Sequence, residues 1–191
     1  MVAGVLLTGG QSRRLGVDKA RVALDGKTFA ARAAAVLSSV CDPCIEVGSG
    51  ASPLRCVRES PAGEGPLVAF VCGVRALHLE PDTSVVLLAC DMPRVSRVLL
   101  QCLVDRPAST VIPIARGRPQ YGCAKYGGPA LEAMARASDA GTRSFKWLQG
   151  GAQHGDIDWI DESVWSTVAD AIEFRDVDTP DDAHELGIEV R

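Results

Sequence analysis

The sequence is poor in aromatic side chains, which make up only 5% of its 191 residues, although 47% of the residues are hydrophobic. A core built from this chain must therefore be filled mainly by valine, leucine and alanine. That balance is too apolar for a disordered chain and suits a layered α/β protein. Because a chain of this length fits one ordinary domain, we expect residues 1–191 to form a single domain.

Long apolar runs and an excess of positive charge are also missing. No run reaches the roughly 20 apolar residues that are needed to span a bilayer, and the first residues lack the basic flank and apolar core of a signal peptide. The formal net charge is −4 and the arginines are scattered, so no basic surface for nucleic acid is expected. We therefore expect a cytoplasmic protein with no nucleic-acid partner and no membrane partner.

The cysteines lack the spacing of a structural zinc site. Among the seven cysteines, Cys41 and Cys44 form the only CxxC pair, and no second pair follows it. Others, such as Cys72, Cys90 and Cys102, lie inside apolar runs, where cysteine acts as a small buried hydrophobe. This pattern favours reduced core thiols over metal binding or redox chemistry.

Short apolar runs alternate with amphipathic segments along the chain. The continuously apolar residues 2–7 are typical of a strand that is buried on both faces. Further strands are predicted at about residues 44–47, 54–57, 84–90, 110–114, 120–126 and 157–160. Helices are predicted at about residues 28–39, 66–79, 96–104, 129–137, 142–149 and 163–171, with a last one starting at Thr179. This alternation predicts a three-layer α/β/α sandwich on a mostly parallel sheet.

A glycine-rich loop follows the first predicted strand and runs to Lys19. The adjacent Gly9 and Gly10 allow backbone N–H groups to approach a phosphate closely. Arg13, Arg14 and Lys19 add positive charge for a polyphosphate. The glycine spacing fits neither a Walker A motif nor a dinucleotide-binding fingerprint. The loop therefore predicts a nucleoside triphosphate site of another kind, with an ordinary basic surface turn as the alternative.

Other candidate ligand groups follow later strands, and in an open α/β sheet ligands bind at the carboxyl ends of strands. Asp91 directly follows a buried strand, where it is placed either to bind Mg²⁺ or to cap the next helix. Asp176 and Asp178 would share a face if they lie on a strand, and both could then point at one cation. Gly65 precedes Pro66 at a predicted helix start, a position that suits anions and close ligand approach.

Four segments, in this order, resemble the molybdenum cofactor guanylyltransferase family, often called MobA. They are residues 7–19, Gly65-Pro66-Leu67, Cys90-Asp91-Met92-Pro93 and Asp176-Val177-Asp178-Thr179-Pro180. The first is specific for the wider superfamily of sugar-phosphate and cofactor nucleotidyltransferases, and the others narrow it. The resemblance implies a Rossmann-like α/β fold that transfers GMP from GTP to molybdopterin-bound molybdenum cofactor and releases pyrophosphate. It also implies Mg²⁺ as cofactor, and other molybdenum cofactor biosynthesis proteins as partners.

The same resemblance implies roles for individual residues. The implied nucleotide-binding residues are Leu7, Thr8, Gly9, Gly10, Ser12, Lys19, Glu59, Gly65 and Asp91. Lys19, Arg13 and Asp91 would act in catalysis, the two cations on the phosphates and Asp91 on Mg²⁺, with Asp178 as a second metal ligand. Cytidylyltransferase relatives tend to carry two alanines at the paired glycines, so Gly9 and Gly10 favour GTP.

The chain departs from the family pattern at several of these positions. Thr8 stands where alanine is usual, Glu59 where an aspartate is common, and Asp176 and Asp178 where a pair of asparagines is usual. The strand end near Ser49 lacks the asparagine that is often found there. Three alternatives therefore stay open: a molybdopterin cytidylyltransferase, a sugar- or lactate-phosphate nucleotidyltransferase, and a non-catalytic nucleotide-binding paralogue.

Overall fold

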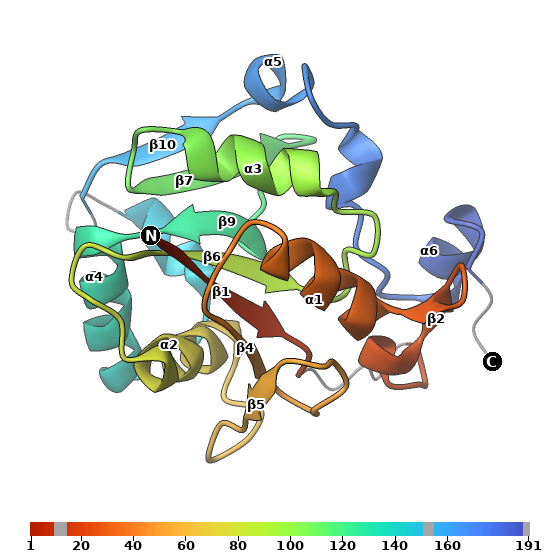
Figure 1. Ribbon diagram of the computed structural model, residues 1–191, viewed down its shortest axis with the longest axis horizontal. Coiled ribbons are helices and arrows are strands. Elements are labelled where there is room, and N and C mark those ends of the chain that lie inside the picture. The colour runs from red at the N-terminus through yellow and green to blue at the C-terminus, as the bar shows by residue number, and fades with distance from the viewer. Residues whose placement is uncertain (10–14, 151–154, 189–191) are drawn as a thin grey trace.

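The computed structural model describes residues 1–9, 15–150 and 155–188, and a central sheet runs through them (Figure 1). The order of its strands is β10-β7-β9-β6-β1-β4-β5, with β8 paired to β7. Its strands are β1 (Val2–Leu7), β4 (Cys44–Val47), β5 (Arg55–Val57), β6 (Ser84–Ala89), β7 (Thr110–Ala115), β8 (Arg118–Pro119), β9 (Cys123–Tyr126) and β10 (Ile157–Ile160). A separate hairpin consists of β2 (Ala23–Leu24) and β3 (Lys27–Thr28).

The sheet is mostly parallel, as the sequence predicts. β1 pairs in parallel with β4 and β6, and β4–β5 and β7–β10 are also parallel pairs. β9 lies between β6 and β7 and is antiparallel to both. The connection from β7 to β9 holds only the short β8 and a turn, so it is too short for the crossover that a parallel strand would need.

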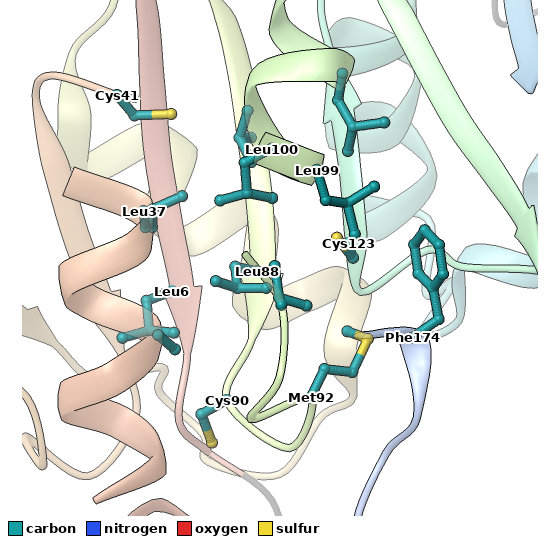
Figure 2. Close-up of a cluster of buried hydrophobic side chains, with 14 of the residues drawn as sticks. Leu6, Leu37, Cys41, Leu88, Cys90, Met92, Leu99, Leu100, Cys123 and Phe174 are labelled. Atoms are coloured by element: carbon teal, nitrogen blue, oxygen red, sulfur yellow. The ribbon is translucent and has the colours of Figure 1, made fainter. Parts of the chain in front are cut away.

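Helices cover both faces of the sheet and make three layers (Figure 1). The α-helices are α1 (Phe29–Ser38), α2 (Pro66–Leu77), α3 (Arg97–Asp105), α4 (Gly128–Asp139), α5 (Glu162–Trp165) and α6 (Pro180–Glu185). Alternate side chains of β1 and β6 enter opposite cores. Leu6 and Leu88 pack with Leu37 of α1 and Leu99 of α3, as Figure 2 shows, whereas Val5 packs in a second core with α2 and α4. Burial on both faces explains the unbroken apolar runs of these strands.

A third, smaller core joins the β2–β3 hairpin to the C-terminal helix α6. Leu24 of the hairpin and Phe29 of α1 pack with Val177, Ala183 and Leu186. The helix begins as predicted, because the Thr179 side chain accepts from the Asp182 N–H in a capping box with proline in the first turn. This core holds the segment around Val177 beside the chain that follows the glycine-rich loop.

Three predicted elements are wrong or shorter than expected, and a fourth segment does not form the strand on which the metal-binding hypothesis for Asp176 and Asp178 depended. Residues 142–149 were expected to be α-helical but form a 3₁₀ helix, η2 (Phe145–Gly150), which places Phe145 and Leu148 on one buried side. The helix expected at 163–171 stops with α5, and Asp170 caps a new 3₁₀ helix, η4 (Ala171–Phe174). Residues 120–122 form a turn before β9. Asp176 and Asp178 lie on irregular chain and not on a strand.

All seven cysteines are free thiols; Cys90 is buried as predicted, whereas Cys72 and Cys102 are only partly buried. Burial, assisted by the neighbouring Cys44, raises the pKa of the Cys41 thiol to about 12, so the CxxC pair is poorly suited to redox chemistry. In the described ranges of the chain, none of the helices combines the length and the apolar character that a membrane crossing requires.

Candidate functional site

A cavity of about 520 Å³ lies at the carboxyl ends of β1 and β4 and beside the start of α2. It is lined by Leu7, Gly9, Val47, Gly48, Arg58, Glu59, Ala62, Gly63, Gly65, Pro66 and Ala69. This is the edge at which open α/β sheets bind ligands, and the volume falls in the usual range for small-molecule sites. Four residues predicted to bind nucleotide, Leu7, Gly9, Glu59 and Gly65, are therefore brought together.

Glu59 carries a carboxylate oxygen that lacks a hydrogen-bond donor. Its Oε1 accepts from the Gly63 N–H at 2.8 Å. Its Oε2 is buried and has no partner among the described residues. A buried, unsatisfied carboxylate oxygen is costly, so this atom is suited to accept hydrogen bonds from a ligand that enters the cavity.

Gly65 is required by a close approach of two backbone segments. Its φ is +111°, and a Cβ at this position would lie 2.6 Å from the carbonyl oxygen of Arg143. The same carbonyl accepts from the Leu67 N–H at 3.3 Å, and the Arg143 side chain forms a 2.7 Å ion pair with Glu64. The glycine therefore lets the start of α2 pack tightly beside residue 143 while it forms part of the cavity wall.

A second group of predicted residues lies around Asp91, two residues after the end of β6. The backbone N–H of Cys90 donates to the Leu7 carbonyl at 3.0 Å, which ties this strand end to the end of β1. The Val177 N–H donates to the Asp91 carbonyl at 2.9 Å. Lys19 forms an ion pair with Asp178, and the Lys19 side chain is only 15% exposed. Lys19, Asp91 and Asp178 are thus close together, although they come from three distant parts of the chain.

The Asp91 carboxyl lies in a strongly acidic environment. Burial raises its pKa to about 6, and the nearby carboxylates of Asp176 and Asp178 add to this effect while Lys19 opposes it. Asp176 and Asp178 therefore both lie near enough to Asp91 to act on its carboxyl, although neither of them lies on a strand. A bound cation would relieve the repulsion among these carboxylates.

The carboxylates of Asp91 and Asp178 suit Mg²⁺, which the protein and the nucleotide would bind together, better than a metal ion that is bound by protein side chains alone. Carboxylate oxygens are the hard ligands that Mg²⁺ prefers, and it is typically bound by one or two carboxylates together with substrate phosphates and water. Within residues 1–9, 15–150 and 155–188, no group of three or more His, Cys, Asp or Glu side chains is arranged to hold a metal ion. Asp91 and Asp178 would therefore need the ligands that a nucleotide supplies.

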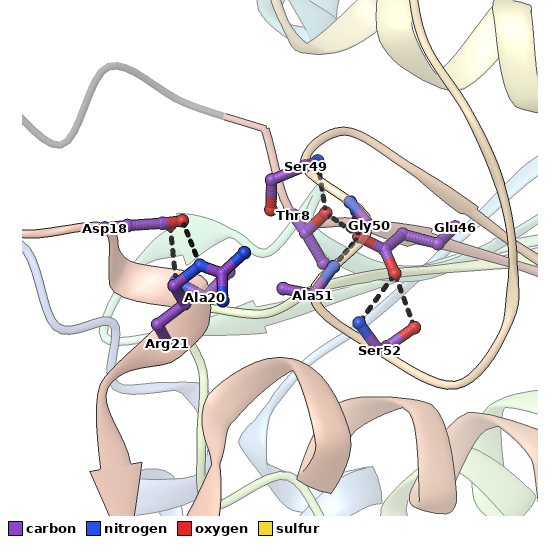
Figure 3. Close-up of polar contacts among 9 residues, drawn as sticks. All are labelled: Thr8, Asp18, Ala20, Arg21, Glu46, Ser49, Gly50, Ala51 and Ser52. Carbon is purple, nitrogen blue, oxygen red and sulfur yellow. Dashed lines mark hydrogen bonds and ion pairs between the residues drawn. The ribbon is translucent and has the colours of Figure 1, made fainter.

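Glu46 was missed by the sequence analysis. Its carboxylate is fully buried at the end of β4 and accepts from the hydroxyl of Thr8, as Figure 3 shows. Burial alone would raise its pKa, but hydrogen bonds from Ser52, Thr8 and Ala51 outweigh this and hold the pKa below its ordinary value. A glutamate inside an otherwise apolar strand was the available signal, since a buried charge requires partners.

Four predicted residues, Gly10, Ser12, Arg13 and Arg14, lie outside the described residues, and their roles stay predictions. Thr8 is buried, and its hydroxyl is hydrogen bonded to Glu46. The remaining predicted residues fall into two groups at the carboxyl ends of β1, β4 and β6. One lines the cavity, and the other combines Lys19 with the acidic residues.

A family model described as "MobA-like NTP transferase domain" matches residues 4–155. A probable molybdenum cofactor guanylyltransferase of Mycobacterium avium is 34% identical over 160 residues, which cover 77% of this chain and 80% of the relative. One of Bacillus cytotoxicus is 28% identical over 198 residues, which cover 97% of this chain and 96% of the relative.

Among solved structures, the fold resembles that of molybdopterin-guanine dinucleotide biosynthesis protein A from Archaeoglobus fulgidus. The TM-score is 0.76 at 22% sequence identity, and the match covers 97% of this chain and 96% of the other. At this identity the match bears on the fold alone. It confirms the predicted α/β class with a mostly parallel sheet between layers of helices.

Proposed function

Because the chain belongs to the family of MobA-like NTP transferases, we propose that it transfers GMP from GTP to molybdopterin-bound molybdenum cofactor and releases pyrophosphate. Nucleotidyl transfer is the chemistry of the family. The choice of GTP and of a pterin acceptor is supported by the names of the relatives and by the chemistry of the cavity. We place the reaction in the cytoplasm, where GTP is plentiful.

The unsatisfied oxygen of Glu59 is the observation that most favours guanine. The Watson–Crick edge of guanine offers two neighbouring donors, N1–H and the N2 amino group, which a carboxylate can accept. Cytosine offers one amino group beside two acceptors, N3 and O2, which a carboxylate repels. A cavity with a buried carboxylate oxygen therefore suits GTP better than CTP.

The reaction joins two anions, so catalysis depends on positioning and charge neutralisation. An oxygen of the terminal phosphate of the pterin attacks the α-phosphorus of GTP in line. A new P–O bond forms, the bond from the α-phosphorus to the bridging oxygen of the β-phosphate breaks, and pyrophosphate leaves with that electron pair. The attacking phosphate is already ionised at neutral pH, so no general base is required. Lys19 and Arg13 stabilise the negative charge that builds up on pyrophosphate.

Asp91 and Asp178 would hold the Mg²⁺ ion. When bound, Mg²⁺ neutralises phosphate charge and helps to align the reacting groups. Lys19 lies beside the same carboxylates through its ion pair with Asp178. Binding of the metal and the triphosphate would let Lys19 share its charge with phosphate oxygens, while the backbone hydrogen bond from Val177 keeps Asp91 in position.

Pyrophosphate release tests the proposal when it is measured with GTP and with CTP. Each nucleotide is assayed without acceptor, with molybdopterin-bound molybdenum cofactor, and with a sugar phosphate or lactate phosphate as the sole acceptor. We expect release with GTP only when the acceptor is present. Faster release with CTP would identify a cytidylyltransferase. GTP binding in a calorimeter without any release would identify a non-catalytic paralogue, and release with a sugar phosphate or lactate phosphate alone would identify another transferase. Each of these three results contradicts the proposal.

A further inference from the structure

Glu46 is a buried carboxylate whose two oxygens are both occupied. Oε1 accepts from the Thr8 hydroxyl and from the N–H groups of Gly50 at 2.8 Å and Ala51 at 2.9 Å. Oε2 accepts from the N–H of Ser52 at 2.9 Å and from its hydroxyl at 2.6 Å. One side chain in the sheet thus fixes both the end of β1 and the loop that follows β4 (Figure 3). A buried charge is tolerated only with such full hydrogen bonding.

The Thr8 hydroxyl connects these two segments a second time. It donates to Glu46 and accepts from the Ser49 N–H at 3.2 Å. Both hydrogen-bonding functions of the hydroxyl are therefore used, which fixes the side-chain rotamer. The backbone N–H of Thr8 also donates to the Val47 carbonyl at 3.0 Å. The residue just before the paired glycines is held on both its backbone and its side chain.

The two segments held in this way form one wall of the cavity. Gly9 and Gly48 both line it, and they touch each other closely. A Cβ on Gly48 would lie 2.4 Å from the Gly9 nitrogen and 2.5 Å from the Thr8 hydroxyl oxygen, and its φ of +143° also favours glycine. The two backbone segments have almost no room to shift against each other at this contact. The hydrogen bonds of Glu46 and Thr8 therefore determine how the segments are placed.

We infer that Glu46 and Thr8 are positioning residues for nucleotide binding, and that their hydrogen bond sets the shape of the Gly9–Gly48 wall against which the nucleotide packs. The inference rests on the proposed function, since it takes the cavity to be the nucleotide site. Glu46 is fully buried, and among the described residues its carboxylate contacts Thr8 and the loop of residues 48–52. Their loss should weaken nucleotide binding more than it slows turnover at saturating nucleotide.

Calorimetric titration of GTP with Mg²⁺ onto purified variants tests this inference. We expect Thr8→Val and Glu46→Gln each to raise the Kd of GTP about tenfold, and Thr8→Ser to restore it because the hydroxyl is kept. The double variant should lose less than the product of the two single effects, since both substitutions act on the same hydrogen-bond network. In the pyrophosphate assay, the KM for GTP should rise by a larger factor than kcat falls.

Thr110→Val is the matched control. Thr110 is equally buried, and its hydroxyl accepts from the Gly127 N–H at 3.3 Å at the amino end of β7. We expect this variant to bind GTP normally, whatever it does to stability. The inference would be overturned, while the proposed function stands, if Thr8→Val binds GTP with its original affinity or if Thr110→Val loses as much affinity as Thr8→Val.

If the protein without any substitution binds neither GTP nor CTP, the proposed function itself fails. The Thr8→Val and Thr8→Ser pair decides the matter even if Glu46→Gln does not fold.

Discussion

Lys19 and Asp178 form an ion pair although they stand 159 positions apart in the chain. The small core shared by the β2–β3 hairpin and α6 holds the two segments together. The pair lies beside Asp91, whose pKa is raised to about 6 by burial and by Asp176 and Asp178, against the effect of Lys19. The C-terminal segment therefore completes a charged site that begins just after the glycine-rich loop.

Removing the charge of either Lys19 or Asp91 should abolish nucleotidyl transfer. Lys19→Ala removes a cation that would neutralise the triphosphate, and Asp91→Ala removes the carboxylate proposed to hold Mg²⁺. We expect each to lower kcat/KM for GTP by on the order of 100-fold or more, with the fold intact by circular dichroism. Lys27→Ala is a suitable control because Lys27 is exposed on β3. Retained turnover in either site variant would contradict these assignments.

Asp178→Asn tests whether this carboxylate binds metal. If Asp178 is a ligand of Mg²⁺, the Mg²⁺ concentration for half-maximal activity should rise roughly tenfold. The control Asp82→Asn removes the same charge from an exposed turn before β6. A lower kcat with an unchanged Mg²⁺ requirement would instead show that Asp178 serves only to hold Lys19.

Glu59→Gln tests how the base is selected. A neutral amide weakens the hydrogen bonds to guanine, and a hydrogen bond to a charged group contributes about 1.5–3 kcal/mol. We therefore expect kcat/KM for GTP to fall by about tenfold or more, while the value for CTP stays the same or rises. The control Glu80→Gln lies on the exposed surface after α2 and should change neither. An equal fall with both nucleotides would argue against base recognition by Glu59.

Glu46 should make stability depend on pH. Its pKa is lower in the folded chain than in the unfolded chain, since its hydrogen bonds outweigh the effect of burial. The stabilisation is therefore fully present above the unfolded pKa of about 4.3 and is lost as the pH falls through the folded pKa. We expect Glu46→Gln to lower the free energy of unfolding by about 1–3 kcal/mol at pH 7. The difference in the free energy of unfolding between the variant and the original protein should become smaller below about pH 4. Urea denaturation at several pH values measures this, and a constant difference would contradict it.

The sequence predicted the sheet well because β1 and β6 are buried on both faces, and such strands leave unbroken apolar runs. It identified Asp91 and Gly65 as candidate site residues because Asp91 closely follows a recognisable strand and Gly65 directly precedes a recognisable helix. It could not show that Arg143 forces the glycine at residue 65, since that contact joins distant segments. The strand assumed at Asp176 and Asp178 was wrong for a related reason. Packing in the small core, rather than strand pairing, places them near Asp91.

Glu46 shows a different limit. The short run Cys-Ile-Glu-Val was recognised as a strand, but the partners of its glutamate are Thr8 and the loop of residues 48–52. Thr8 differs from the alanine expected by resemblance, and the loop lacks the expected asparagine. In the sequence, each departure only weakened the assignment to the guanylyltransferase family. In the folded chain, Thr8 and Ser49 are joined by a hydrogen bond beside the cavity.

The most direct test of the central claim follows the phosphate label of GTP. The protein is incubated with Mg²⁺, molybdopterin-bound molybdenum cofactor and GTP that is labelled either at the α-phosphate or at the γ-phosphate. We predict that the α-label moves into the pterin product and that the γ-label leaves in pyrophosphate. Label from the γ-phosphate in the product, or no labelled pterin from either substrate, would contradict guanylyl transfer by this protein.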